Sequence, residues 1–138
     1  MSSKFEVLID SDALIGRFFP DDPHNNKSTQ LFEDLEDTKS SVVTTSLVVI
    51  EVATVLSHKA NQALAKTFVE VMNRGNLPII HITQELQQSA LKVFVEQTQK
   101  GSSVVDCVNV VVMKKFRIPQ IFSFDKIYAK KFSLDVFN

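Results

Sequence analysis

The chain has 138 residues, of which 44% are hydrophobic and 22% charged, and its formal net charge is −1. These proportions are those of an ordinary globular protein and exclude a disordered chain, and the length predicts a single domain over residues 1–138. The single cysteine, Cys107, excludes an internal disulfide, and the three histidines have none of the spacings of zinc ligands. Zinc chemistry is therefore not expected.

The sequence contains no segment expected to enter a membrane. No apolar run reaches the roughly 18 residues of a membrane span. The N-terminal stretch "MSSKFEVLID" turns acidic before a signal-peptide core could form. We therefore expect a cytoplasmic protein without membrane contact.

Strand patterns alternate with helix patterns along the whole chain. "FEVLI" and "SVVTT" are β-branched or apolar runs typical of strands, whereas "SDALIGRFF" and "KSTQLFEDLED" have helical spacing. The predicted elements are, in chain order, strand 5–9, helix 11–19, helix 27–37, strand 41–45, helix 47–58, helix 61–74, strand 77–82, helix 84–100, helix 104–116, strand 119–124, helix 125–132 and an edge strand 134–137. The predicted helix N-caps are Ser11 or Asp12, Ser46, Thr83, and Ser102 or Ser103. This alternation predicts an α/β sandwich around a mostly parallel sheet.

Two acidic residues stand where apolar side chains are expected. Glu51 is the only charged residue of "LVVIEVATVL", and it shares a helical stripe with Leu47 and Val55 that is predicted to face the core. Burying an unpaired carboxylate costs several kcal/mol, so Glu51 requires a partner. Asp106 lies in the apolar run "SSVVDCVNVVVMKKF", although its spacing from Ser103 is also that of a capping box.

Two more aspartates follow strands. Asp10 follows "EVLI" and Asp125 follows "IFSF", and each alone could be a helix N-cap. In an open parallel sheet, however, sites form at the carboxyl ends of the strands, where Glu51 and Asp106 are also expected. Four carboxylates that meet there repel one another and need cations. Carboxylates favour Mg²⁺ or Mn²⁺, which can promote hydrolysis of a phosphodiester bond.

The order of these motifs resembles the PIN domain family and, within it, the VapC-like ribonuclease toxins of toxin–antitoxin pairs. "VLIDSDALI" resembles the opening strand with its first catalytic aspartate, Asp10, and "TTSLVVIEV" the segment that carries Glu51. "SSVVDCVNVVVMKKF" and "IFSFDKIYAKKF" resemble the segments of the third and fourth acids, Asp106 and Asp125. The resemblance implies an α/β/α sandwich with about five strands, Mg²⁺- or Mn²⁺-dependent RNA cleavage, an antitoxin protein partner and a homodimer.

Three further residues are candidates for contact with the substrate or for support of the site. The family often has asparagine two residues after the first aspartate, where this chain has Asp12, for which we favour a role as cap of the first helix. Ser123 matches a family preference for serine or threonine two residues before the fourth acid and could hydrogen-bond a site carboxylate or the scissile phosphate. Lys126 is adjacent to Asp125.

Six basic residues gather in the last part of the chain, although the net charge is near zero. Residues 101–138 contain Lys114, Lys115, Arg117, Lys126, Lys130 and Lys131 against three aspartates, whereas residues 1–40 contain nine acids against four bases. The basic residues predict either a surface that attracts phosphates or the solvated face of a helix.

Two other functions remain open from the sequence. "LIDSDAL" also fits the DxD opening of haloacid-dehalogenase-like phosphatases, in which Asp12 would matter as much as Asp10. A catalytically silent PIN-like binding module could instead use apolar side chains such as Phe18 and Phe19 to dock a partner. We favour core packing for these two aromatics, and also for Cys107, which has no histidine near it in the sequence.

Overall fold

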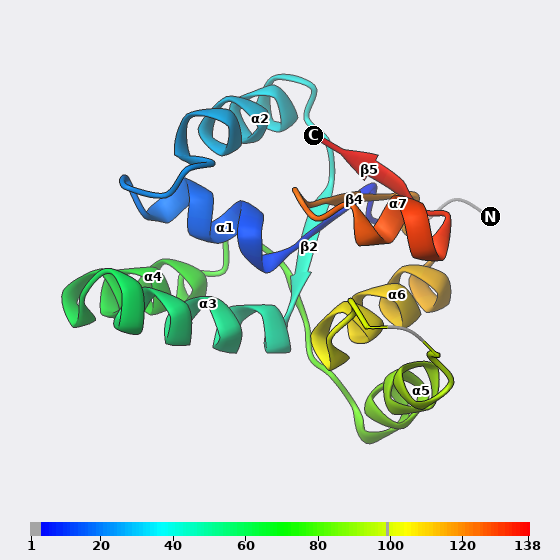
Figure 1. Cartoon of the computed structure of the whole chain (residues 1–138). Helices are drawn as coiled ribbons and strands as arrows, with labels where there is room; N and C mark the ends of the chain where they lie inside the picture. Colours follow the sequence, from blue (N-terminus) through cyan, green and yellow to red (C-terminus); the bar gives the residue numbers. More distant parts are fainter. Residues whose placement is uncertain (1–3, 99) are drawn as a thin grey trace.

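Five parallel strands form the central sheet in the order β3-β2-β1-β4-β5 (Figure 1). The computed structural model describes residues 4–98 and 100–138. The strands are β1 (Val7–Ile9), β2 (Val42–Thr45), β3 (Ile79–Ile80), β4 (Gln120–Phe122) and β5 (Asp135–Phe137). The predicted α/β fold with a parallel sheet of about five strands is therefore confirmed.

Seven helices connect and cover the strands. They are α1 (Ser11–Phe18), α2 (Asn25–Asp37), α3 (Ser46–Lys59), α4 (Gln62–Asn73), α5 (Gln84–Val95), α6 (Val104–Phe116) and α7 (Ile127–Phe132). The main difference from prediction is α5, which was expected to continue to Lys100 but ends at Val95. Residue 99, within that expected helix, lies outside the described part of the chain. None of the helices in residues 4–98 and 100–138 is long and apolar enough to cross a membrane.

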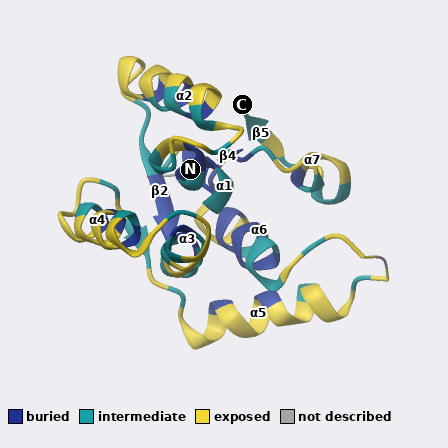
Figure 2. Cartoon of the chain, turned by 60° about the vertical axis from the view of Figure 1, so that its left-hand side comes forward, coloured by how far each residue is buried: buried dark blue, intermediate teal, exposed yellow. Residues whose placement is uncertain are grey.

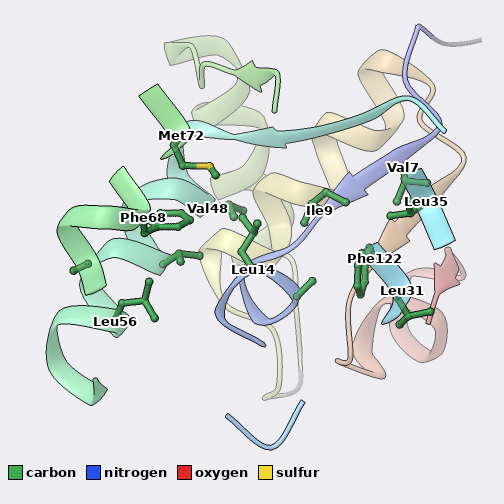
Figure 3. Packing of buried hydrophobic residues seen from close by; sticks show 13 residues of the cluster. Val7, Ile9, Leu14, Leu31, Leu35, Val48, Leu56, Phe68, Met72 and Phe122 are labelled. Atoms are coloured by element: carbon green, nitrogen blue, oxygen red, sulfur yellow. The ribbon is translucent and has the colours of Figure 1, made fainter. Parts of the chain in front are cut away.

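Helices cover both faces of the sheet, which explains why its central strand β1 is a continuous buried apolar run. On one face, Val7 and Ile9 of β1 pack with buried residues of α1, α2, α3 and α4 (Figure 3). On the other face, Leu8 packs with α5, α6 and α7. Figure 2 shows α5 as an outer helix with a largely exposed surface, and it contacts the sheet layer through α6.

The predicted N-caps are confirmed at α5 and α6, but they are wrong at α3 and at α1, which is capped by Asp10 instead of Ser11 or Asp12. Asn61, Thr83 and Ser103 cap α4, α5 and α6 through their side-chain oxygens. The cap of α3 is Thr45 rather than the predicted Ser46. Ser46 instead accepts a hydrogen bond from the backbone of Ile82, which ties the start of α3 to the segment after β3.

The two aromatics before Pro20 pack inward, as favoured from the sequence. Phe18 and Phe19 are half-buried against the first core cluster. The ring of Phe18 meets Phe68 of α4 edge-on, with centroids 5.0 Å apart. Cys107 is fully buried in the second cluster, so its predicted packing role is also confirmed.

Candidate functional site

Asp10 is the buried centre of a hydrogen-bond network at the carboxyl end of the sheet. It follows β1, forms the N-cap of α1 and is only 4% exposed. Its Oδ1 accepts hydrogen bonds from the backbone N–H of Ser11 at 2.7 Å and from Nδ2 of Asn109 at 3.0 Å. Its Oδ2 accepts one from the hydroxyl of Ser123 at 2.9 Å. Donors from α1, α6 and the loop after β4 thus fix both carboxylate oxygens.

Asp12 does not cap the first helix, because Asp10 occupies that position. The Asp12 side chain reaches across to the loop after β4, where its Oδ2 accepts hydrogen bonds from the backbone N–H of Phe124 at 2.9 Å and from the Ser123 hydroxyl at 3.2 Å. Its Oδ1 is buried and has no hydrogen-bond partner among the described residues. The capping role favoured for Asp12 is therefore wrong, and its carboxylate belongs to the network around Asp10.

Burial and mutual repulsion make both carboxylates easier to protonate. Desolvation raises the pKa of Asp10 to about 6, and repulsion from Asp106 adds to this against the lowering effect of the hydrogen bonds. Desolvation likewise raises the pKa of Asp12 to about 7, with a further contribution from the charge of Asp10. Near neutral pH the network therefore favours uptake of a positive charge, either a proton or a cation.

Asp106 joins the network through Tyr128. It forms the predicted capping box with Ser103, in which its Oδ2 accepts from the Ser103 backbone at 2.9 Å and its own N–H donates to the Ser103 hydroxyl. Its Oδ1 accepts a hydrogen bond from the Tyr128 hydroxyl at 3.0 Å, which in turn accepts one from Asn109 Nδ2. Burial and the charges of Asp10 and Asp106 raise the pKa of Tyr128, so its hydroxyl stays a neutral donor.

The other two predicted acids lie outside these hydrogen bonds. Glu51 is half-buried rather than buried, because the core stripe of α3 consists of Val48, Val52 and Leu56. No hydrogen bond or ion pair within residues 4–98 and 100–138 involves its carboxylate. Asp125 is exposed.

Asp125 is nevertheless attached to the network through its backbone. Its N–H donates to the Ser123 hydroxyl at 3.0 Å, while its Oδ1 accepts from the backbone of Ile127 at 2.9 Å. Ser123 is fully buried and contacts both Asp10 and Asp12, as expected for a residue that hydrogen-bonds a site carboxylate. Lys126 is exposed, and no ion pair involves it in the described part of the chain.

The donor set fits a divalent cation in part. The described residues contain no group of three or more His, Cys, Asp or Glu side chains already arranged to hold a metal ion. Yet Asp10 and Asp106 repel each other, and the buried Oδ1 of Asp12 lacks a partner. Carboxylate oxygens that lack compensating charge are the ligands hard divalent cations prefer.

Sequence reasoning missed Asn109 and Tyr128. Asn109 is fully buried and lies one turn after Asp106 on α6, so a polar side chain in the apolar run "VVDCVNVVVM" was an available signal. Tyr128 is the only tyrosine of the chain and is also fully buried. Nothing local in its sequence indicates contact with a helix 22 positions earlier.

The basic residues of the last part of the chain are mostly exposed. Lys114, Lys115 and Arg117 lie at the end of α6, and Lys126 and Lys130 belong to the start and body of α7. Lys115 lies 3.7 Å from Glu85 of α5. This distribution is compatible with both expectations, a phosphate-attracting surface and solvated helix faces.

Comparisons with known proteins agree with the fold. Among solved structures, the chain is similar to the crystal structure of Mycobacterium tuberculosis VapC20, described as a sarcin-ricin loop cleaving toxin, with a TM-score of 0.80 and 18% identity. The similarity covers 90% of this chain and 93% of VapC20. No curated protein sequence matches. The family profile described as "PIN domain" matches residues 7–132, from β1 to the end of α7, and the chain therefore belongs to the PIN domain family.

Proposed function

We propose that this PIN domain is a metal-dependent endoribonuclease that hydrolyses RNA phosphodiester bonds, and that it is the toxin of a toxin–antitoxin pair. The observation that carries the proposal is the buried Asp10, whose pKa is raised to about 6 by desolvation and by Asp106 at the carboxyl edge of the sheet. The structural similarity to a toxin that cleaves the sarcin-ricin loop supports the substrate class.

In this proposal Asp10, Glu51, Asp106 and Asp125 hold Mg²⁺ or Mn²⁺. The cation supplies activation of a water and stabilisation of the leaving oxygen. The hydrogen bonds from Ser11, Asn109 and Ser123 keep the Asp10 oxygens fixed, so little reorganisation is needed when the cation and the phosphate arrive.

Tyr128 and Lys126 have supporting roles. The neutral Tyr128 hydroxyl orients Asp106 by donating a hydrogen bond to its Oδ1. Lys126 is exposed beside Asp125 and is placed to contact a phosphate of the RNA. Glu51 and Asp125, which have no hydrogen bond to Asp10, would complete the ligand set when the cation binds.

The test is cleavage of a labelled, structured RNA pool by the purified chain with Mn²⁺ or Mg²⁺, beside EDTA. Asp10→Asn and Asp106→Asn are expected to abolish cleavage and to weaken Mn²⁺ binding measured by calorimetry. Asp37→Asn, which changes an exposed acid at the end of α2, is the matched control and should leave both unchanged. Unchanged RNA cleavage by Asp106→Asn would contradict the proposal.

The second candidate is a catalytically silent PIN-like binding module. It is favoured by one observation, the absence of contacts from Glu51 and Asp125 to the Asp10 carboxylate among the described residues. A folded protein that binds Mn²⁺ but cuts no RNA would support it. The phosphatase alternative predicts a different result, because Asp12→Asn would then abolish phosphatase activity as completely as Asp10→Asn.

The proposed antitoxin partner has a candidate groove on the face of α1, α2 and α4. A cavity of about 540 Å³ there is lined mainly by apolar side chains, including Leu14, Phe18 and Met72, and its charged lining residues are Arg17, Lys39 and Glu36. Such a lining suits an amphipathic peptide that carries acidic residues. Co-purification with the product of the neighbouring gene, lost on Arg17→Glu, would support this partner.

Light scattering of the purified chain tests the proposed homodimer.

A further inference from the structure

Three aromatic rings lead from the core to the surface beside the candidate site. Phe122 of β4 is fully buried, and its ring meets Phe124 edge-on with centroids 5.9 Å apart. Phe124 is half-buried and lies flat against His24, with centroids 4.1 Å apart and an angle of 6° between the rings. His24 is exposed, so it is the outermost ring of this set. The His24 ring is stacked on Phe124, and the residue as a whole is exposed to solvent.

The ring set is attached to the candidate site through the backbone of Phe124. The N–H of Phe124 donates to Oδ2 of Asp12 at 2.9 Å. Phe124 also stands between Ser123, which hydrogen-bonds Asp10, and Asp125. The His24 ring, stacked on Phe124, therefore has a defined position relative to the carboxylates.

His24 is held firmly although it is exposed. The backbone N–H of His24 donates to Oδ2 of Asp22 at 2.9 Å, and its backbone carbonyl accepts a hydrogen bond from the backbone N–H of Ser28 at 2.8 Å. Gly16 of α1 permits a close approach, because an added Cβ there would lie 3.3 Å from both the Cβ and the carbonyl oxygen of His24. Asn25 donates to the carbonyl oxygen of Gly16 at 2.8 Å. These contacts fix the backbone of His24, and stacking on Phe124 holds its ring, so the ring loses little conformational freedom when a ligand stacks on it.

We propose that the exposed His24 ring is a stacking platform for one nucleobase of the RNA strand bound at the carboxylate site, an inference that rests on the proposed ribonuclease function. Unpaired RNA bases are commonly bound by stacking on aromatic side chains, histidine included. Lys27, three residues after His24, and Lys126, two residues after Phe124, are exposed and would contact the neighbouring phosphates. Because every base has an aromatic face, the platform favours an unpaired base without strong sequence preference.

The experiment measures binding of fluorescein-labelled single-stranded RNA by anisotropy, with Ca²⁺ in place of the catalytic cation. The proteins are the wild-type chain, His24→Ala, His24→Phe, and His58→Ala as a matched control, since His58 is an exposed histidine at the far end of α3. Each is tested on intact RNA and on a series that carries one abasic nucleotide at successive positions. Circular dichroism verifies that each variant is folded.

A stacking role predicts a specific pattern. His24→Ala should weaken binding of intact RNA about 5- to 20-fold, the range expected for one base stacked at an exposed site. His24→Phe and His58→Ala should bind as the wild type does. At one position in the RNA, the abasic nucleotide should weaken binding to the wild-type chain by a similar factor. The same abasic RNA should bind to His24→Ala no more weakly than intact RNA does.

Two results would overturn the inference, and they differ in what they say of the proposed function. If His24→Ala binds as tightly as the wild type, or if every abasic RNA weakens both proteins equally, His24 has no stacking role while the ribonuclease proposal stands. If the wild-type chain neither binds nor cleaves any of these RNAs, the ribonuclease proposal fails and the stacking role fails with it.

Discussion

Replacing Asp12 by asparagine should stabilise the protein above neutral pH and not in acid. The pKa of Asp12 is raised from 3.8 to about 7 in the folded state, mainly by burial and then by the charge of Asp10. Between about pH 4 and pH 7 the folded chain therefore holds more protons than the unfolded chain, so this group lowers the stability as the pH rises. The contribution of protonated Asp12 to the free energy of unfolding is fully present below pH 4 and is lost by about pH 7.

The size of the effect follows from two opposing contributions. Because the pKa of Asp12 is raised from 3.8 to about 7, its charged carboxylate lowers the free energy of unfolding by about 4 kcal/mol at about pH 8. The amide of asparagine carries no charge and avoids this loss of stability. The amide also places an NH₂ group where Oδ1 of Asp12 has no partner, at a cost of about 1–3 kcal/mol. We therefore expect Asp12→Asn to gain about 2 kcal/mol at about pH 8 and to lose about 1 kcal/mol at about pH 4.5.

Urea unfolding in EDTA, followed by far-ultraviolet circular dichroism because the chain has no tryptophan, measures both values. Asp37→Asn serves as the control, since this acid is exposed and should show no difference between the two pH values. A loss of stability by Asp12→Asn that is equal at both pH values would refute the reasoning, because it would mean that the Asp12 charge costs nothing in the folded state.

Other substitutions test the network and the core. Tyr128→Phe removes the hydroxyl that bridges Asn109 and Asp106, and should cost about 1–3 kcal/mol in urea unfolding; an unchanged midpoint would show that water replaces it. Ser103→Ala removes one half of the capping box and should cost about 1 kcal/mol of stability in urea unfolding. It should also lower the initial rate of RNA cleavage. A normal rate would show that Asp106 does not need the support of Ser103. Phe68→Ala opens a fully buried site and should cost about 3–5 kcal/mol without changing the Mn²⁺ affinity of the folded protein; a loss below 1 kcal/mol would contradict the packing seen here.

The sheet could be predicted because strands buried on both faces appear as short apolar runs. "FEVLI" and "PQIFSF" each contain a three-residue strand, and the residue after each strand lies on the same edge of the sheet. This is why Asp10 could be placed from the sequence. Ser123 is indicated by the family resemblance instead, because the predicted strand ran on to Phe124 whereas β4 ends at Phe122; its contact with Asp10 is confirmed.

The position of Glu51 could not be settled in this way. The run "LVVIEVATVL" is apolar on nearly every side, so the stripe of Leu47, Glu51 and Val55 and the neighbouring stripe with Val48 and Val52 are equally plausible core faces. The choice depends on how α3 packs against α1 and α4. Contacts across the sheet likewise decided the role of Asp12, whose partners come from a loop more than a hundred positions later.

The same long sequence separations have a consequence for how the protein is made. The hydrogen bonds to Asp10 come from Asn109 and Ser123, which follow it by 99 and 113 positions. Ribosomes deliver a chain from its N-terminus, so most of this protein leaves the exit tunnel before Asp10 can be enclosed. A nascent chain therefore carries its acidic residues without this arrangement, and the network around Asp10 closes only after β4 has docked beside β1.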